Sequence, residues 1–205
     1  MPSRYTFDVL PRREIEIKLR VSDLADILHK IRALRPRLLG RVFEQNTLYD
    51  TPAGDLRRRD CLLRLRSETP AASKLVRAGK LAAVITSKSP APSSARSPYK
   101  QKLETELPLK NIRAWRRAMH KLGFRPAFRY EKFRSTFLLR DLHLDLDETP
   151  AGIFLELEGS PRAIDRAARA LGFARNDYLR STYWDLYAAD CRRRGRRTRN
   201  MLFGT

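Results

Sequence analysis

The stretch REIEIKLR, residues 13–20, alternates charged and apolar side chains from Glu14 onward. In an extended strand, such a period of two sends the two kinds of side chain to opposite faces. One face carries Ile15, Ile17 and Leu19, and the other carries Glu14, Glu16 and Lys18. The stretch is therefore typical of a β-strand with one apolar face and one face that holds charges of both signs.

The same alternation recurs in six further stretches of the chain. Their charged positions are Arg64, Arg66, Lys88, Lys102, Glu104, Glu106, Lys132, Arg134, Asp145, Asp147, Glu156 and Glu158. Any one of these strands alone is typical of an antiparallel sheet with one solvated face. Taken together they favour another arrangement, because the polar positions are almost purely charged and the opposite positions are bulky enough to pack under helices.

A closed barrel accounts for this collection of strands. When a sheet closes on itself, one face lines the interior, and helices packed outside can cover the apolar face. The charged face would then form a lumen. Carboxylates clustered there would need a cation such as Mg²⁺ or Mn²⁺, and the Lys and Arg side chains would need an anion such as phosphate. The pattern predicts a site for a metal-bound polyphosphate.

The remaining periodicity predicts an α+β fold with a largely antiparallel sheet. Strands are expected near residues 12–20, 42–50, 61–67, 80–88, 99–108, 128–140, 141–148 and 152–159. Helices are expected at residues 22–36, 111–124, 160–173 and about 177–189, with Ser22, Asn111 and Ser160 as caps of the first three. In the second helix, Ile112, Trp115, Met119 and Leu122 are expected to face the core.

Length and composition suit one domain with appendages, since the chain has 205 residues of which 42% are hydrophobic. The net charge of +20 favours polyanionic partners such as nucleic acid, acidic membranes or polyphosphates. No signal peptide and no membrane span are expected, and the two cysteines have no metal-ligand spacing. A cytoplasmic location is the default expectation. The stretch CRRRGRRTRN at residues 191–200 predicts a disordered basic tail over residues 191–205.

Six stretches in a fixed order resemble the CYTH family, also called triphosphate tunnel metalloenzymes. EIEIK at residues 14–18 is similar to the family's ExExK signature. The other matching stretches are LYDTPAGDLRRRDCLLRLR (48–66), VITSKSP (84–90), LETEL (103–107), EKFR (131–134) and LDLDETPAGIFLELEG (144–159). The resemblance covers roughly residues 12–188. It divides the chain into an N-terminal extension (1–11), a tunnel domain (12–190) and the tail.

The resemblance implies an eight-stranded antiparallel β-barrel with a charged lumen, helices packed outside, and a triphosphate bound with Mg²⁺ or Mn²⁺. The implied metal ligands are Glu14, Glu16, Glu104, Glu106, Asp145, Glu156 and Glu158. The implied phosphate ligands are Lys18, Arg64, Arg66, Lys88, Lys132, Arg134 and Arg180, the last on the final helix. Direct roles in catalysis are implied for Glu14, Glu16, Lys18, Lys88 and Glu158.

Three functions are compatible with this resemblance, because a fold does not fix an activity. The first is metal-dependent hydrolysis of a triphosphate such as inorganic tripolyphosphate, thiamine triphosphate or a nucleoside triphosphate. The second is a class IV adenylyl cyclase that converts ATP to cyclic AMP and pyrophosphate. The third is a polyphosphate- or RNA-binding module without catalysis, in which the basic tail could make weak contacts with nucleic acid. The oligomeric state stays open.

Overall fold

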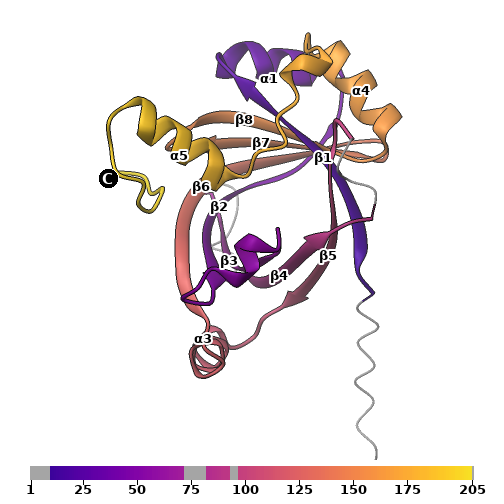
Figure 1. The fold of residues 1–205 in the computed structure, drawn as a ribbon. Coiled ribbons are helices and arrows are strands. Elements are labelled where there is room, and N and C mark those ends of the chain that lie inside the picture. The colour runs from indigo at the N-terminus through magenta and orange to yellow at the C-terminus, as the bar shows by residue number, and fades with distance from the viewer. Residues whose placement is uncertain (1–9, 72–81, 93–96, 205) are drawn as a thin grey trace, which may run out of the picture.

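The computed structural model describes residues 10–71, 82–92 and 97–204 and shows a closed barrel of eight antiparallel strands, as predicted (Figure 1). The strands are β1 (Arg12–Val21), β2 (Arg37–Asp50), β3 (Leu62–Pro70), β4 (Ala82–Pro90), β5 (Lys100–Pro108), β6 (Arg125–Leu139), β7 (Leu142–Thr149) and β8 (Gly152–Glu158). Around the barrel they follow the order β1-β5-β4-β3-β2-β6-β7-β8. Most of the N-terminal extension expected over residues 1–11 lies outside the described residues.

Five α-helices accompany the barrel in the described part of the chain. They are α1 (Leu24–Ala33), α2 (Asp55–Arg58), α3 (Ile112–Lys121), α4 (Pro161–Ala170) and α5 (Tyr183–Arg193). Asn111 and Ser160 cap α3 and α4, as predicted. The cap of α1 is Asp23 instead of Ser22, because the Asp23 carboxylate accepts hydrogen bonds from the first backbone N–H groups of the helix.

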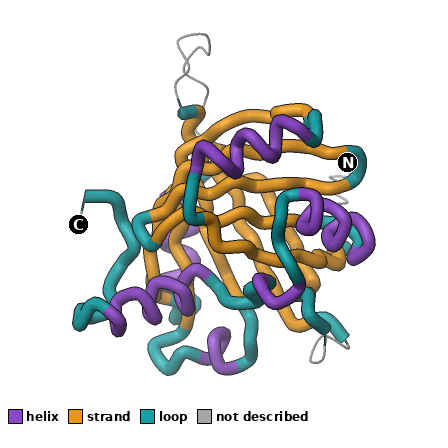
Figure 2. Tube along the Cα trace, turned by 90° about the horizontal axis from the view of Figure 1, so that it is seen from above, coloured by secondary structure: helices purple, strands orange, loops and turns teal. Residues whose placement is uncertain are grey.

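The apolar core lies on the outside of the barrel, between the strands β1, β7 and β8 and the helices α1 and α4. Figure 2 shows helices lying over the strands on this upper side of the barrel. Its fully buried members include Ile17 and Leu19 of β1, Leu144 of β7, Leu155 of β8 and Ile164 of α4. Burial of each such side chain stabilises the folded state by about 1.5–3 kcal/mol. Burial of this outer face leaves the other face of the same strands, with most of its charged side chains, turned into the lumen.

Strand β1 pairs with two neighbours, and this register brings its charged residues next to those of β5 and β8. On one side Glu16 lies opposite Lys100. On the other side Glu16 lies opposite Glu158, and Lys18 lies opposite Glu156. The ExExK and ExE stretches, which are about 140 residues apart in the sequence, therefore share one wall of the lumen.

The prediction for the C-terminal part of the chain was wrong in two respects. The last helix begins at Tyr183 instead of residue 177, because Leu179 forms an isolated bridge with Lys18 and Thr182 then caps the helix. The tail is not disordered from residue 191: α5 continues to Arg193, and Met201 pairs with Tyr130 of β6. Met201 is fully buried, so this apolar side chain anchors the tail to the barrel.

Helix α3 also departs from expectation, because none of its residues is buried. It lies at one edge of the barrel (Figure 1). Trp115 is half-buried and packs edge-on against Tyr49, with 4.9 Å between the ring centroids. Leu122, just after the helix, is 67% exposed. The apolar stripe of α3 is therefore in contact with the rim of the barrel instead of a core.

Candidate functional site

The barrel encloses a cavity of about 500 Å³ that is lined mainly by charged side chains. Eight Lys or Arg residues and nine Asp or Glu residues contribute to its wall. The predicted site residues among them are Glu14, Glu16, Lys18, Arg64, Arg66, Lys88, Glu104, Glu106, Lys132, Arg134, Asp145, Glu156 and Glu158. All predicted site residues except Arg180 therefore lie in one lumen.

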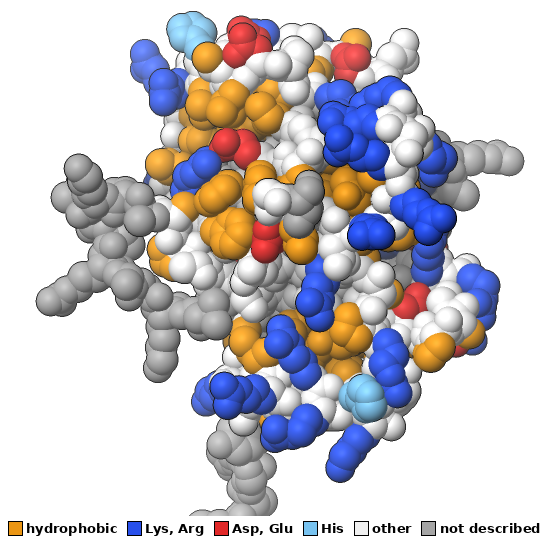
Figure 3. All heavy atoms as spheres, turned by 90° about the vertical axis from the view of Figure 1, so that its left-hand side faces the viewer, with side chains coloured by type: hydrophobic (Ala, Val, Ile, Leu, Met, Phe, Trp, Pro, Cys, Tyr) orange, Lys and Arg blue, Asp and Glu red, His pale blue; other side chains and the backbone are white. Residues whose placement is uncertain are grey.

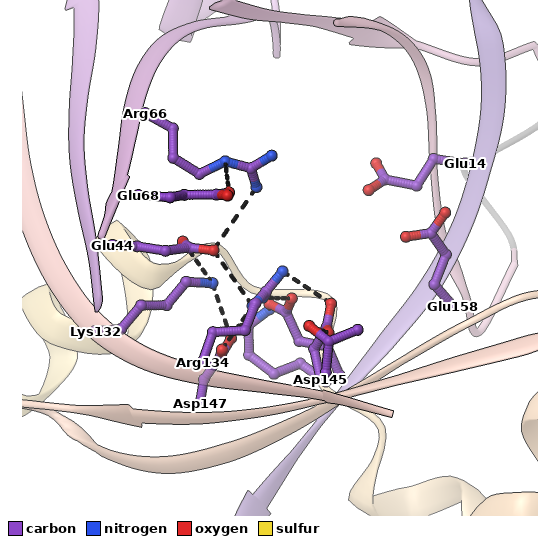
Figure 4. A network of polar contacts seen from close by, with 12 residues as sticks. Glu14, Glu44, Arg66, Glu68, Lys132, Arg134, Asp145, Asp147 and Glu158 are labelled. Carbon is purple, nitrogen blue, oxygen red and sulfur yellow. Dashed lines mark hydrogen bonds and ion pairs between the residues drawn. The ribbon is translucent and has the colours of Figure 1, made fainter. Parts of the chain in front are cut away.

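One wall of the lumen carries carboxylates from β1, β5 and β8. Figure 4 shows Glu14 and Glu158 projecting from this wall toward the open centre. The Lys88 ammonium donates to both oxygens of Glu14, at 2.5 and 2.7 Å, and lies 3.2 Å from Glu104. Lys100 donates to Glu16 at 2.6 Å. Each of these carboxylates is thus close to a cation as well as to other carboxylates.

The carboxylates of this wall differ in their ease of ionisation. Burial, together with the nearby Glu14 charge, raises the pKa of Glu158 to about 7. Burial and the Glu16 charge also raise the pKa of Glu14, although Lys88 opposes them. For Glu16, burial is overcome by Lys100 and Lys18, which lower the pKa to about 2. Negative charge at Glu14 and Glu158 is therefore incompletely compensated by the protein.

The opposite wall is built around Glu44 of β2, a residue that the sequence analysis did not assign to the site. Its carboxylate is only 1% exposed and lies 3.5 Å from Lys132, 3.7 Å from Arg134 and 3.8 Å from Arg66. Burial raises its pKa, but these cations prevail and lower the pKa to about 2. Val42, Glu44 and Asn46 lie two residues apart along β2 and therefore share one face of the strand. This spacing was the signal that could have identified Glu44.

Beside Glu44, strands β6, β7 and β8 form a dense ion-pair network. The Arg134 guanidinium contacts Asp145 at 2.8 Å, donates to Asp147 at 2.7 Å, and also donates to Glu156. Glu156 in turn accepts from Lys18. Asp145 and Glu156, both expected to bind metal, are therefore occupied as acceptors for basic side chains.

The two arginines of β3 lie near Glu106 of β5. Arg66 lies 3.2 Å and Arg64 3.5 Å from Glu106, which also accepts a 2.8 Å hydrogen bond from Thr86. Arg64 donates to Thr86 at 3.0 Å, but its buried Nε atom has no hydrogen-bond partner among the described residues. The structure thus divides the predicted acidic set, since Glu106 belongs with the arginines and not with Glu14 and Glu158.

Arg180 is the one predicted phosphate ligand that the structure does not place in the lumen. It is exposed, does not line the cavity, and precedes α5 instead of lying on it. Two residues of α5 do line the lumen, Tyr183 and Trp184, and neither was predicted as a site residue. Tyr183 makes the closer polar contacts. Its hydroxyl donates to Asp147 at 2.5 Å, and its ring lies 4.6 Å below the Lys18 ammonium. Helix α5 therefore closes one side of the lumen.

The carboxylate wall fits a hard divalent cation in its chemistry. Its donors are all carboxylate oxygens, which Mg²⁺ and Mn²⁺ prefer. Within the described residues, no three acidic, His or Cys side chains converge closely enough to hold a metal as they stand. The raised pKa values of Glu14 and Glu158 nevertheless mark a place where added positive charge is favourable. Glu14, Glu16, Glu104 and Glu158 are the residues that would hold it.

Comparison with known proteins gives a family for this arrangement. A sequence model described as the CYTH domain matches residues 12–183. The chain belongs to the CYTH family. The match begins at the first residue of β1 and ends at the first residue of α5, so it covers the whole barrel.

Three relatives illustrate the range of the family. A protein of Methanocaldococcus jannaschii with the provisional name adenylate cyclase MJ0240 is 23% identical, and the alignment covers 84% of this chain and 97% of that protein. A structure from Vibrio parahaemolyticus, also provisionally named an adenylate cyclase, has a TM-score of 0.71 and 19% identity over 86% of this chain and 98% of its own. HpAC1 from Hippeastrum, described as having a dominant triphosphatase activity, has a TM-score of 0.54 and 21% identity, covering 90% and 97%.

Over the described residues, no helix has the length and apolar character that a bilayer crossing requires.

Proposed function

We propose that the chain catalyses divalent-metal-dependent hydrolysis of a triphosphate bound in the lumen. The observation that carries this proposal is the division of the lumen into two unlike walls (Figure 4). Glu14 and Glu158 form one wall, and Arg66 and Lys132 project from the other. A triphosphate with its metal needs both, because carboxylates hold the cation and basic groups hold the phosphate oxygens.

The basic residues bind the phosphates and neutralise charge that develops on their oxygens. Arg64 and Arg66 present planar guanidinium groups, which suit bidentate contacts with phosphate. The Nε atom of Arg64 supplies a donor that no acceptor in the described part of the chain uses. Lys88 lies between Glu14 and Glu104 and can contact a phosphate beside the cation. Such positioning and charge neutralisation supply most of the catalysis of phosphoryl transfer.

The carboxylates Glu14, Glu16, Glu104 and Glu158 would hold Mg²⁺ or Mn²⁺ in the lumen. A bound divalent cation neutralises phosphate charge and lowers the pKa of water toward neutrality. Tyr183 and the α5 helix restrict access of bulk water from their side of the barrel. Restricted water access strengthens the electrostatic contacts between the lumen and its substrate.

A specific observation favours a second candidate, the class IV adenylyl cyclase. A second cavity of about 330 Å³ shares six lining residues with the lumen, Leu48, Leu62, Lys88, Lys100, Thr182 and Trp184, so the two are contiguous. Its wall combines apolar side chains such as Phe128 with charged ones such as Lys102 and Asp185. This cavity can accept the organic part of a nucleoside or thiamine triphosphate. A cyclase would use it to direct the ribose 3′-hydroxyl at the α-phosphorus.

The relatives support both candidates. The Methanocaldococcus jannaschii protein carries a cyclase name, whereas the Hippeastrum protein is described as mainly a triphosphatase. The charged lumen is required by either reaction, since both must neutralise a triphosphate.

The experiment that tests the proposal is an assay of the purified chain with tripolyphosphate, ATP and thiamine triphosphate. Each substrate is incubated with Mg²⁺, Mn²⁺ or EDTA, and phosphate and cyclic AMP are measured separately. Phosphate release that EDTA abolishes is expected. Cyclic AMP with pyrophosphate from ATP would establish the cyclase instead, and binding without any turnover would establish a non-catalytic module.

Two variants connect the assay to the lumen. Glu14→Gln removes a carboxylate of the metal wall, and we expect it to reduce turnover by at least about a hundredfold. Glu148→Gln is the matched control, because Glu148 also pairs with a basic residue, Arg41 at 2.6 Å, but lies outside the lumen. Full activity in Glu14→Gln would contradict the proposed metal wall.

A further inference from the structure

The lumen does not account for the positive charge of the chain. Eight basic and nine acidic side chains line it, so the lumen is close to neutral. The chain nevertheless carries a net charge of +20. The excess positive charge must therefore lie on the outer surface or in the segments beyond the described residues.

A large part of this excess lies on and around α3. Between residues 107 and 130 there are seven Lys or Arg residues and no Asp or Glu. Within the helix, Arg113, Arg116, Arg117 and Lys121 follow the spacing i, i+3, i+4 and i+8, which places them on one face. All four are exposed. Figure 3 shows basic side chains gathered at the lower end of the molecule, where α3 lies in Figure 1.

Each of the other four α-helices in the described residues contains at least one Asp, whereas α3 contains no acidic residue. In α1 the Lys30 ammonium lies 2.7 Å from Asp26, and in α5 Asp190 pairs with Arg193 and Arg194. None of the four residues of the α3 face forms an ion pair with a described residue. Like charges three or four residues apart destabilise a helix by some tenths of a kcal/mol per pair. Nothing in the described structure compensates this cost.

We propose that the basic face of α3, formed by Arg113, Arg116, Arg117 and Lys121, is a docking surface for the phosphate backbone of a nucleic acid. From its first to its fourth member the face spans about 12 Å of helix, which is enough for two or three consecutive phosphates. The face makes contacts through charge, and the proposal does not depend on the activity in the lumen.

A membrane surface fits this helix less well than a nucleic acid does. Amphipathic helices that bind membranes insert their apolar face between the lipids. In α3 the apolar face is already in use, since Trp115 packs against Tyr49 of β2. The charged side chains on the side that remains accessible are all basic, and the exposed apolar surface there is small, with Leu122 as its one large member among the described residues. Tyr49 also lines the second cavity, so a nucleic acid docked on α3 would lie beside the entrance to that cavity.

The test compares two triple variants of the full chain that remove the same charge. Arg113, Arg116 and Arg117 are changed to Gln in the first. In the second, the control, Arg162, Arg166 and Arg169 of α4 are changed to Gln. The control residues are exposed, and α4 lies far from α3 in the barrel (Figure 1). Binding of a fluorescent single-stranded RNA of about 20 nucleotides is measured by anisotropy at several salt concentrations, with excess tripolyphosphate present to occupy the lumen.

We expect the α3 variant to lower RNA affinity by at least about tenfold and to reduce the slope of log K against log salt by about two. The α4 control should change neither quantity by a comparable amount. Circular dichroism and urea unfolding confirm that both variants are folded. Equal losses in the two variants would show that net charge alone attracts RNA and would overturn the proposal. Absence of RNA binding, or tighter binding to phosphatidylserine vesicles than to RNA, would also overturn it.

Discussion

Replacement of Glu158 by Gln should make the metal-free protein more stable at pH 8. Glu158 lies in the carboxylate wall, where burial and the Glu14 charge raise its pKa from 4.5 to about 7. An acid whose pKa is raised on folding costs stability above its unfolded pKa, and the full cost is reached above its folded pKa. Gln keeps the shape of the side chain and can still accept from Arg12, which donates to Glu158 at 2.8 Å.

The size of the gain follows from the shift in pKa. A difference of about 2.5 units between the folded and unfolded states corresponds to an upper limit of roughly 3 kcal/mol. A quarter of the Glu158 side chain is exposed, so solvent screening reduces this to about 1–2 kcal/mol. For a chain of this length, 1 kcal/mol shifts the melting temperature by roughly 2–4 °C. The expected increase is therefore about 2–8 °C.

Thermal and urea unfolding in EDTA measure the gain at about pH 8 and pH 4.5. The gain should be complete at the higher pH and nearly absent at the lower pH, where Glu158 is protonated in the folded protein. Glu148→Gln serves as the control, because its side chain is similarly exposed, at 26%, and pairs with Arg41. This control should show no such pH-dependent gain.

Added Mg²⁺ completes the experiment. Metal that binds only the folded state raises the stability of the unmodified chain by mass action. The Glu158→Gln variant should lose most of this increase. A variant that is less stable than the unmodified chain at both pH values would refute the idea that the carboxylate wall carries uncompensated negative charge.

Three other substitutions test separate parts of the structure. Glu44→Gln should destabilise the protein by about 3 kcal/mol near pH 7 in urea unfolding, with the difference shrinking as the pH falls from 4.5 toward 2, where the Glu44 carboxylate itself is protonated. Tyr183→Phe should cost about 1–3 kcal/mol in the same assay, because Asp147 loses a buried donor; unchanged stability would contradict that hydrogen bond. Met201→Ala should lower the melting temperature by several degrees, since it opens a cavity beside Phe128. If the tail were disordered, Met201→Ala would leave the melting temperature unchanged.

Strand periodicity predicted which residues face the lumen, but not which of them meet across it. The period of two along each strand predicted that Glu14, Glu106 and Glu156 face the same interior, and the structure confirms that prediction. It could not show that Glu106 lies with Arg66 while Glu14 lies with Lys88, because closure of the barrel decides the distances across the lumen. Those distances depend on strands that are far apart in the sequence.

The two wrong predictions for the C-terminal part, the start of α5 and the disordered tail, also result from contacts between residues far apart in the sequence. The stretch around residue 180 has helical spacing, yet Leu179 exchanges backbone hydrogen bonds with Lys18, and this tertiary contact delays the start of α5. The arginines after Cys191 indicated disorder by composition. The segment is ordered despite these arginines, because the side chain of Met201 is buried against β6 and holds the residues that follow α5 in place.

The position of β1 between β5 and β8 has a consequence for the way the protein is made. The strand that carries Glu14, Glu16 and Lys18 leaves the ribosome before the other strands of the barrel, and its partner β8 follows more than a hundred residues later. The barrel cannot close until that partner has been synthesised. The charged residues of β1 therefore remain part of an open sheet until β8 is available for pairing. Completion of the lumen is thus among the last events of folding, and a chain truncated before β8 would lack Glu158 and the closed barrel alike.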